Sequence, residues 1–218
     1  MGMRRVRVGG ANSVSDKDLN LELSGTVFVD TSDYDDRTIP HTIHVLNRIG
    51  SSGNMTVKGC GRLVFEHYSD FWGALTVQDT ATVAVNFGCG FTRGGRTTVS
   101  SGAAVEVAQS GSLSFGRDLT LADGAILGFN FTEKAPPVLN MSGKTVTLGS
   151  QKNNIVKITA VEGKRAYGGV NVLTAGGKFA GANVTLAEGA PKWAKRVRVD
   201  NNEIVLDVIT LGTYIFVK

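Results

Sequence analysis

The middle of the chain alternates apolar and polar positions in short runs, and the same run returns along the sequence. Each copy has a short alternating strand, a turn of small residues and a second alternating strand. The four copies are 55–65, 75–85, 97–107 and 119–129. Alternation at a period of two is typical of β-strands with one buried face. A looser copy follows at 145–148 and 155–158.

The spacing of the apolar anchors gives the repeat length. In each copy a second anchor follows the first by six positions, and successive first anchors are 20, 22 and 22 residues apart. The anchor pairs are Val57 with Leu63, Val77 with Val83, Val99 with Val105, and Leu121 with Leu127. One unit cannot bury its apolar face alone, whereas units stacked in register bury it together. The spacing predicts an all-β parallel β-helix with coils of about 20–22 residues, and a β-sandwich is the second choice.

The turns and the domain boundaries follow from the same repeat. Small or turn-forming residues occupy the same place in every copy: Gly59 and Gly61, Asp79 and Thr80, Ser101 and Gly102, Asp123 and Gly124. We expect irregular N-terminal coils or a cap over 1–53, regular β-solenoid repeats over 54–163, and atypical closing coils with a tail over 164–218.

Composition agrees with many short strands and excludes some partners. The chain has 28 Gly but only 4 Pro among 218 residues, and 42% of its residues are hydrophobic. The net charge is +4, and groups of basic residues lie near the two ends of the chain. An acidic stretch follows the first basic group. The charged groups are Arg4, Arg5 and Arg7, then Asp30, Asp33, Asp35 and Asp36, and finally Lys192, Lys195, Arg196 and Arg198. A nucleic-acid binder gathers its cations on one continuous face, so we expect no nucleic-acid partner.

Several segments resemble the autotransporter passenger-associated repeat. They are Gly59-Cys-Gly-Arg-Leu-Val-Phe65, Ser69-Asp-Phe-Trp-Gly73, Leu75-Thr-Val77 and Ala81-Thr-Val-Ala-Val85. The stretches 170–181 and 195–208 are similar to the closing unit of such proteins, the second as a strand, an Asp-Asn turn and a strand. The resemblance implies a single-stranded right-handed parallel β-helix (a solenoid) in a bacterial protein that is secreted or displayed at the outer membrane. Such passengers act as adhesins, as stalks or in self-association.

Targeting features are missing from the sequence itself. Residues 1–10 lack the apolar core of a signal peptide, and no stretch approaches the roughly 20 apolar residues of a membrane helix. We therefore expect a partial sequence of a secreted or cell-surface protein, with no membrane span within the chain.

The function expected from these features is a non-catalytic structural or adhesive module. No catalytic, cofactor-binding or metal-binding residue is predicted, and the expected partners are surface glycans or proteins, or further copies of the chain. One alternative is a carbohydrate-active enzyme, a polysaccharide lyase or glycosidase, which needs carboxylates facing across a groove. Its candidate residues are Asp79, Glu106, Asp118 and Asp123, with Arg93, Arg96 and Arg117 as sugar-acid contacts.

A glycan- or ice-binding module is the other alternative. Its candidates are the recurring Thr56, Thr76, Thr98 and Thr120, and the aromatic Tyr68, Phe71, Trp72 and Trp193. Metal sites are possible at two places. The histidines His41, His44 and His67 are interpreted as exposed histidines and not as metal ligands. The carboxylates of 30–36 are interpreted as a solvated loop and not as a calcium site. Two half-buried thiols are expected at Cys60 and Cys89, and their pairing is left open.

Overall fold

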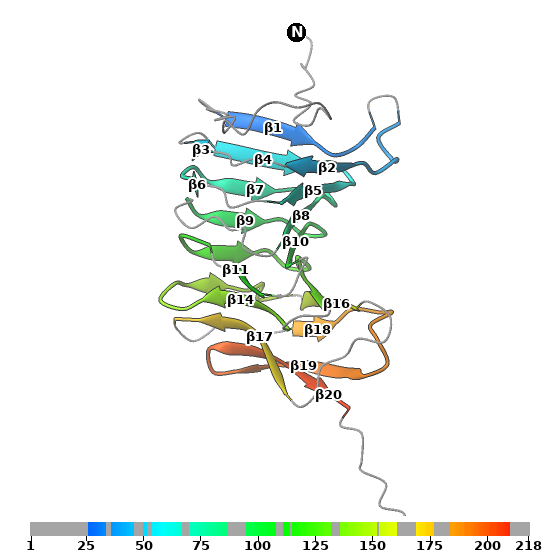
Figure 1. The fold of residues 1–218 in the computed structure, drawn as a ribbon, viewed down its shortest axis with the longest axis vertical. Coiled ribbons are helices and arrows are strands. Elements are labelled where there is room, and N and C mark those ends of the chain that lie inside the picture. Colours follow the sequence, from blue (N-terminus) through cyan, green and yellow to red (C-terminus); the bar gives the residue numbers. More distant parts are fainter. Residues whose placement is uncertain are drawn as a thin grey trace, which may run out of the picture.

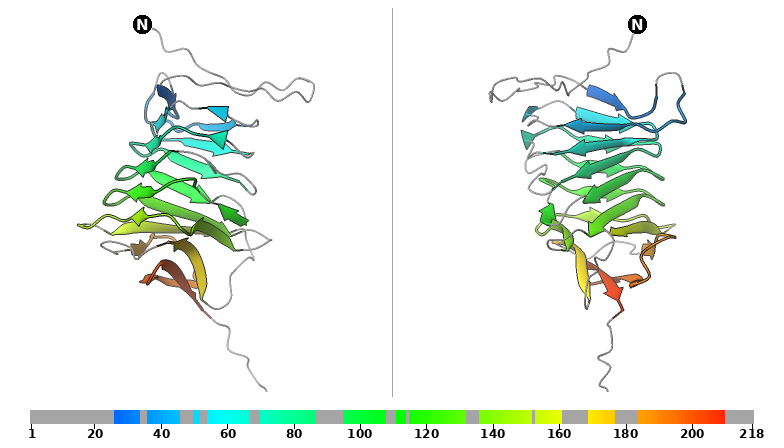
Figure 2. Two further views of the ribbon diagram at one scale, coloured as in Figure 1. Left: turned by 90° about the vertical axis from the view of Figure 1, so that its left-hand side faces the viewer. Right: turned by 45° about the vertical axis from the view of Figure 1, so that its right-hand side comes forward.

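The described residues form β-strands and turns, without a helix. In the computed structural model they are 26–33, 36–45, 50–51, 54–66, 70–86, 95–107, 111–113, 115–131, 136–151, 153–160, 169–176 and 184–209. Strands of successive repeats lie one below another along the long axis of the molecule (Figures 1 and 2). The prediction of an all-β fold with parallel sheets is confirmed.

The first strand of each repeat lies in a six-stranded parallel sheet with the order β1-β4-β7-β9-β12-β15. Its strands are β1 (Thr26–Asp30), β4 (Asn54–Lys58), β7 (Leu75–Val77), β9 (Thr97–Val99), β12 (Leu119–Leu121) and β15 (Val146–Thr147). In register, Val77 lies between Val57 and Val99. Leu121 follows Val99. The predicted anchors are therefore direct neighbours in one sheet, at the spacing of the repeat.

The second strand of each repeat lies in a seven-stranded parallel sheet with the order β18-β16-β13-β10-β8-β5-β2. Its strands are β2 (Thr42–Val45), β5 (Arg62–Phe65), β8 (Thr82–Val85), β10 (Ala104–Val107), β13 (Ile126–Phe131), β16 (Asn154–Ala160) and β18 (Val184–Leu186). The two strands of a repeat thus pair with equivalent strands of neighbouring repeats and not with each other. A β-sandwich is typically antiparallel, so this parallel pairing disfavours that alternative.

In a third sheet the strand pairing changes from parallel to antiparallel toward the C-terminal end. Its order is β11-β14-β17-β20-β19, with parallel pairing from β11 to β17 and antiparallel pairing from β17 onward. The strands are β11 (Gly111–Leu113), β14 (Pro137–Met141), β17 (Val170–Ala175), β19 (Ala194–Asp200) and β20 (Glu203–Val208), and a separate pair is formed by β3 (Gly50–Ser51) and β6 (Asp70–Phe71). The turn between β19 and β20 falls in the 195–208 stretch, where the resemblance implies a strand, a turn and a strand.

Tight turns join the first sheet to the second. The Ala103 amide donates to the Ser100 carbonyl over 3.1 Å, and Gly102 between them has a φ of 79°. A positive φ at the third residue is what a type II turn requires, and glycine adopts it without strain. Gly124 repeats this conformation with a φ of 73°. In an earlier repeat Asp79 takes a φ of 58°, which Asp tolerates better than most residues.

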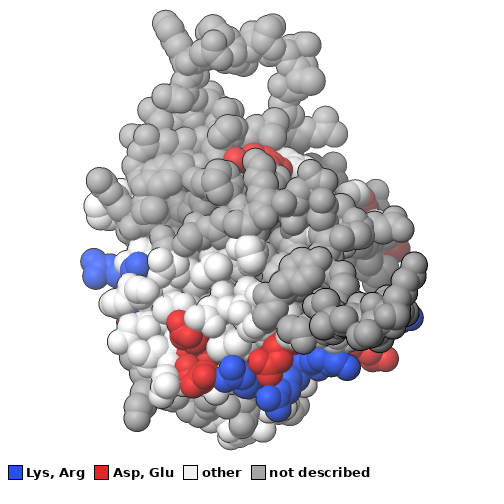
Figure 3. All heavy atoms as spheres, turned by 60° about the horizontal axis from the view of Figure 1, so that its bottom comes forward, with Lys and Arg blue, Asp and Glu red and all other residues white. Residues whose placement is uncertain are grey.

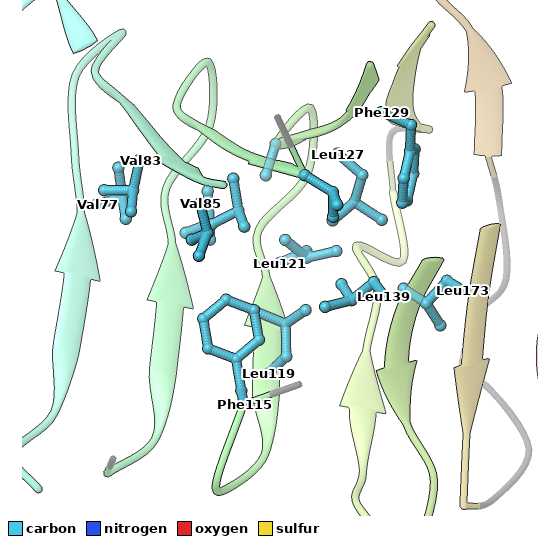
Figure 4. Packing of buried hydrophobic residues seen from close by; sticks show 14 of the residues in the cluster. Val77, Val83, Val85, Phe115, Leu119, Leu121, Leu127, Phe129, Leu139 and Leu173 are labelled. Atoms are coloured by element: carbon cyan, nitrogen blue, oxygen red, sulfur yellow. The ribbon is translucent and has the colours of Figure 1, made fainter. Parts of the chain in front are cut away.

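The core is one continuous column of inward side chains (Figure 4). In β12 the pattern is buried, half-buried, buried, and Leu119 and Leu121 point inward. Leu127 and Phe129 reach the same interior from β13, each 1% exposed. Burying a side chain of this size stabilises the folded chain by about 1.5–3 kcal/mol. Stacked repeats therefore supply the burial that a single repeat lacks.

Candidate functional surface

The outer face of the six-stranded sheet carries a column of hydroxyl groups. Successive pairs place one threonine from each strand in line, as Thr56, Thr76, Thr98, Thr120 and Thr147. The first four were predicted to recur at one repeat position, and the pairing confirms it. Thr147 was missed, although it lies in the looser copy at 145–148. Neighbouring strands lie about 4.8 Å apart, which sets the spacing along the column.

Two further columns flank the threonines. Two positions before each threonine come Asn54, Ala74, Arg96, Asp118 and Thr145, and two positions after come Lys58, Gln78, Ser100 and Ala122. In β4, Asn54 and Lys58 share the face of Thr56, because side chains two apart on a strand point the same way. The other flanking residues lie just outside their strands. Arg96 is exposed and Lys58 is half-buried. In the described part of the chain, neither cation pairs with a carboxylate.

An exposed tryptophan lies in the connection between β6 and β7. Trp72 comes two residues before Ala74 and is 54% exposed. Trp193 belongs elsewhere, because its ring packs edge-on against Phe131 with the ring centroids 5.2 Å apart. The proposed aromatic platform is therefore not formed by these two rings together. The side chain of Phe71 and all of Tyr68 lie outside what the structure describes.

The carboxylates considered for catalysis bind neighbouring repeats. An Asp79 oxygen accepts a hydrogen bond from the Gly59 amide over 3.0 Å. Asp118 accepts one from the Thr145 amide over 3.0 Å. Asp123 lies in a turn and accepts one from the Gln151 amide, over 3.1 Å. These bonds hold one repeat to the next, and the local sequence pattern indicates only the turn positions and not the distant amide partner.

The fourth candidate carboxylate belongs to an ion pair on the outer face of the seven-stranded sheet. Glu106 in β10 accepts a hydrogen bond from Arg62 in β5 over 2.6 Å, and the pair spans the intervening strand β8. Beneath it, Val64 and Ala84 form a small outer cluster, 3% and 0% exposed. Arg93 lies outside the described residues, and Arg117 is exposed.

The two described histidines have different partners. His41 Nε2 lies 2.7 Å from an Asp33 oxygen, and His44 Nδ1 lies 2.6 Å from Glu66. Among the described residues, no group of three or more His, Cys, Asp or Glu side chains is placed to hold a metal ion. His67 falls outside the described ranges.

Two carboxylates of the acidic segment that starts at the end of β1 bind other groups of the same segment. Asp30 pairs with Arg37, and Asp36 accepts hydrogen bonds from the hydroxyl and the amide of Thr38. The Thr38 hydroxyl, followed by its amide, holds the pKa of Asp36 below its ordinary value. These contacts engage Asp30 and Asp36 with groups of the same loop. Asp35 is not among the described residues.

Cys60 is a half-buried free thiol beside the same loop, as expected. The Cys60 amide donates to the Ser32 hydroxyl over 3.0 Å, and the thiol donates to the Arg37 carbonyl over 3.3 Å. The loop is thereby attached to the next repeat. Cys89 lies outside the described residues.

A shallow, open hollow of about 290 Å³ lies where β17 meets the β19–β20 turn. It is lined by Thr174, Ala175, Asp200, Asn201, Asn202 and Glu203. The Glu203 carboxylate accepts hydrogen bonds from Asn171 over 2.6 Å and from Thr174 over 3.4 Å. None of the residues considered for chemistry lies here.

Comparison with known proteins adds no relative. No family model, no curated protein and no solved structure matches the chain. Among the described residues there is no helix with the length and apolar character needed to cross a membrane.

Proposed function

We propose that the chain is a non-catalytic structural or adhesive module from an autotransporter-like passenger, folded as a single-stranded right-handed parallel β-helix. The in-register pairing of successive repeats in two parallel sheets supports this proposal most strongly. A connection that leaves a strand and returns to pair in parallel in the same sheet is right-handed in nearly all proteins. Each repeat would then be one coil, and the stacked coils would form a rigid rod.

The mechanism is display without a chemical step. Backbone pairing fixes the outward side chains at the spacing of the strands, so a partner meets a regular surface. The partners we propose are glycans or proteins of another surface, or further copies of the chain, met outside the bacterial cell.

The rival enzyme function needs two carboxylates that face each other across a groove. Asp79, Asp118 and Asp123 accept hydrogen bonds from backbone amides of neighbouring repeats. That engagement favours a structural role for these carboxylates over acid–base catalysis.

The proposal is tested by locating the protein in the cells that produce it. Antibodies against the purified chain should label intact cells or the culture medium. Labelling confined to the cytoplasm would contradict it. Incubation of the purified chain with a panel of polysaccharides should release neither reducing ends nor unsaturated uronic acids, and product formation would favour the enzyme.

A further inference from the structure

We infer that Asn140 is an acceptor for an N-linked sugar, added by an enzyme that transfers sugars from a phosphate-activated donor. This inference goes beyond the proposed function, because it concerns a covalent modification of one turn and not the displayed surface. It draws on a short sequence motif, on the exposure of its side chains and on the conformation of the turn that holds it.

Four segments of the chain carry the motif Asn-x-Ser/Thr, which is the acceptor sequence for N-linked sugars. They begin at Asn54, Asn130, Asn140 and Asn183. Asn183 lies outside the described residues, as does Thr132, the hydroxyl residue of the second motif. The structure therefore compares Asn54-Met-Thr56 with Asn140-Met-Ser142, which share the same middle residue.

Asn140 and Ser142 lie at the end of a strand, where an enzyme can reach both side chains. Asn140 is the last residue but one of β14, and Ser142 lies in the turn that follows. Both residues are exposed, whereas Met141 between them is buried and attaches the segment to the core. Gly143, the next residue of the turn, has a φ of 76° and nothing within 4 Å of the place where a Cβ would stand. The motif therefore ends on an accessible turn.

The turn also holds Asn140 in a conformation that suits the reaction. Its side-chain oxygen accepts a hydrogen bond from the Ser142 amide over 3.0 Å, which makes an Asx turn. The asparagine side chain is thereby held beside Ser142, the residue whose hydroxyl completes the motif. In the described structure the Nδ2 group of Asn140 makes no hydrogen bond. The nitrogen that has to react is therefore available.

Asn54 has the same motif inside a sheet. Its strand β4 pairs with β1 on one side and with β7 on the other. The Asn54 side-chain oxygen accepts a hydrogen bond from the Ala74 amide of the next repeat over 2.9 Å. Thr56, which supplies the hydroxyl, is only 9% exposed. An enzyme would have to break two ladders of backbone hydrogen bonds to take up this segment, so the structure favours Asn140 over Asn54.

The transfer is a substitution at the anomeric carbon of the sugar. The donor is a sugar whose C1 carries a phosphate ester. The bond from Asn140 Nδ2 to C1 forms, the bond from C1 to the phosphate oxygen breaks, and the phosphate leaves with the electron pair. The nitrogen loses one proton to a base of the transferring enzyme, so charge and atoms balance without an oxidant or reductant.

The test is mass spectrometry of the chain purified from the cells that produce it. Trypsin cuts after Lys134 and Lys144 and releases the peptide 135–144, in which Asn140 is the only asparagine and Ser142 the only hydroxyl residue. The peptide 49–58 contains Asn54 as its only asparagine. We expect a sugar on the peptide 135–144 and none on the peptide 49–58.

Variants of the two motifs identify the acceptor atom. Asn140→Gln should remove the sugar completely, because the longer side chain moves the amide away from its place in the turn. Ser142→Ala should also remove it, whereas Ser142→Thr keeps the hydroxyl and should keep the sugar. Asn54→Gln is the matched control and should leave the peptide 135–144 modified as in the parent. Circular dichroism checks that every variant folds.

Three results would overturn the inference. They are an unmodified peptide 135–144, equal modification of the peptide 49–58, and a sugar that remains in Asn140→Gln, which would place it on Ser142. Labelling of intact cells with an unmodified Asn140 would leave the display function standing. A modified Asn140 in a protein confined to the cytoplasm would remove the display function and leave this inference standing.

Discussion

The regular repeats from β4 to β13 and the C-terminal end from β17 to β20 solve the same burial problem differently. In the repeats, parallel strands keep one register, and inward side chains such as Val77 and Val99 lie directly on one another. At the end, β17 and β19 pair with β20 in antiparallel fashion, each with one shift of register. The repeats depend on stacking with equivalent neighbours, whereas the end closes the same apolar core with an antiparallel hairpin.

The position of β19 at the edge of its sheet accounts for the charged surface of the C-terminal end. An open sheet leaves unpaired backbone groups at its edge, and charged side chains on an edge strand oppose pairing with other chains. β19 lies at the edge of its sheet and carries the exposed Lys195 and Arg196. Figure 3, which turns this end of the molecule forward, shows basic and acidic side chains lying next to one another. On their described outer faces the repeats carry regular columns of side chains and the ion pair of Arg62 with Glu106, whereas β19 and β20 carry a cluster of ion pairs around Asp207.

The largest expected effect is a cavity in the repeats. Leu121→Ala should lower the free energy of unfolding by about 2–5 kcal/mol, because the side chain is 1% exposed in the middle of the stack. Leu206→Ala in β20 removes an equally buried side chain. Hydrogen exchange separates the two regions: Leu121→Ala should speed exchange in the strands on both sides, and Leu206→Ala chiefly in β17, β19 and β20. Equal loss of protection along the whole chain in both variants would contradict the comparison.

Glycine substitutions in the two regions should have effects of intermediate size on the free energy of unfolding. A Cβ on Gly61 would lie 2.1 Å from the His41 carbonyl oxygen and 2.2 Å from that of Thr31. Backbone must therefore move, and Gly61→Ala should cost about 1–3 kcal/mol. Gly189, which precedes β19, has a φ of 77° and nothing within 4 Å of such a Cβ. Gly189→Ala should cost about 1–2 kcal/mol from backbone strain alone.

Urea unfolding of the two glycine variants measures these costs. A second substitution at each position distinguishes steric clash from backbone strain. Gly61→Ser, with a larger side chain, should be less stable than Gly61→Ala. Gly189→Asn should recover most of the loss, because Asn tolerates a positive φ. A Gly61→Ala chain as stable as the parent would show that repeats are not packed as closely as the backbone contacts indicate.

The sequence predicted what depends on local pattern. Alternation at Val57 and Leu63 and the spacing to the next copy were sufficient for the strands, their faces and their stacking. The bridge from Arg62 to Glu106 could not be predicted, because it joins residues 44 apart across an intervening strand. The same holds for the amide partner of Asp118, 27 residues away. Such contacts depend on the length of every turn between them, and no local pattern records the sum of those lengths.

The smallest expected effect is the response of the C-terminal end to acid. Arg196 donates to Asp207 over 2.6 Å, and Arg198 donates to it over 3.3 Å. The hydrogen bond from Arg196, with a smaller one from Arg198, holds the pKa of Asp207 below its ordinary value of 3.8. Arg198 also donates to Asp200, which raises the pKa of Arg198 further above its usual range.

The direction in which stability changes with pH follows from the lowered pKa of Asp207. A carboxyl group whose pKa is lower in the folded than in the unfolded chain stabilises folding above the unfolded value, and the contribution is lost as the pH falls through the folded value. Because the pair is solvent-exposed, we expect less than about 1 kcal/mol. Asp207→Asn should therefore unfold at lower urea than the parent near neutral pH, and the gap should narrow as the pH falls below the ordinary value of 3.8. Hydrogen exchange should place the loss in β19 and β20, with β7 and β9 unchanged. A gap that stays constant with pH would show that the asparagine disturbs packing and that the ion pair contributes nothing to this end of the molecule.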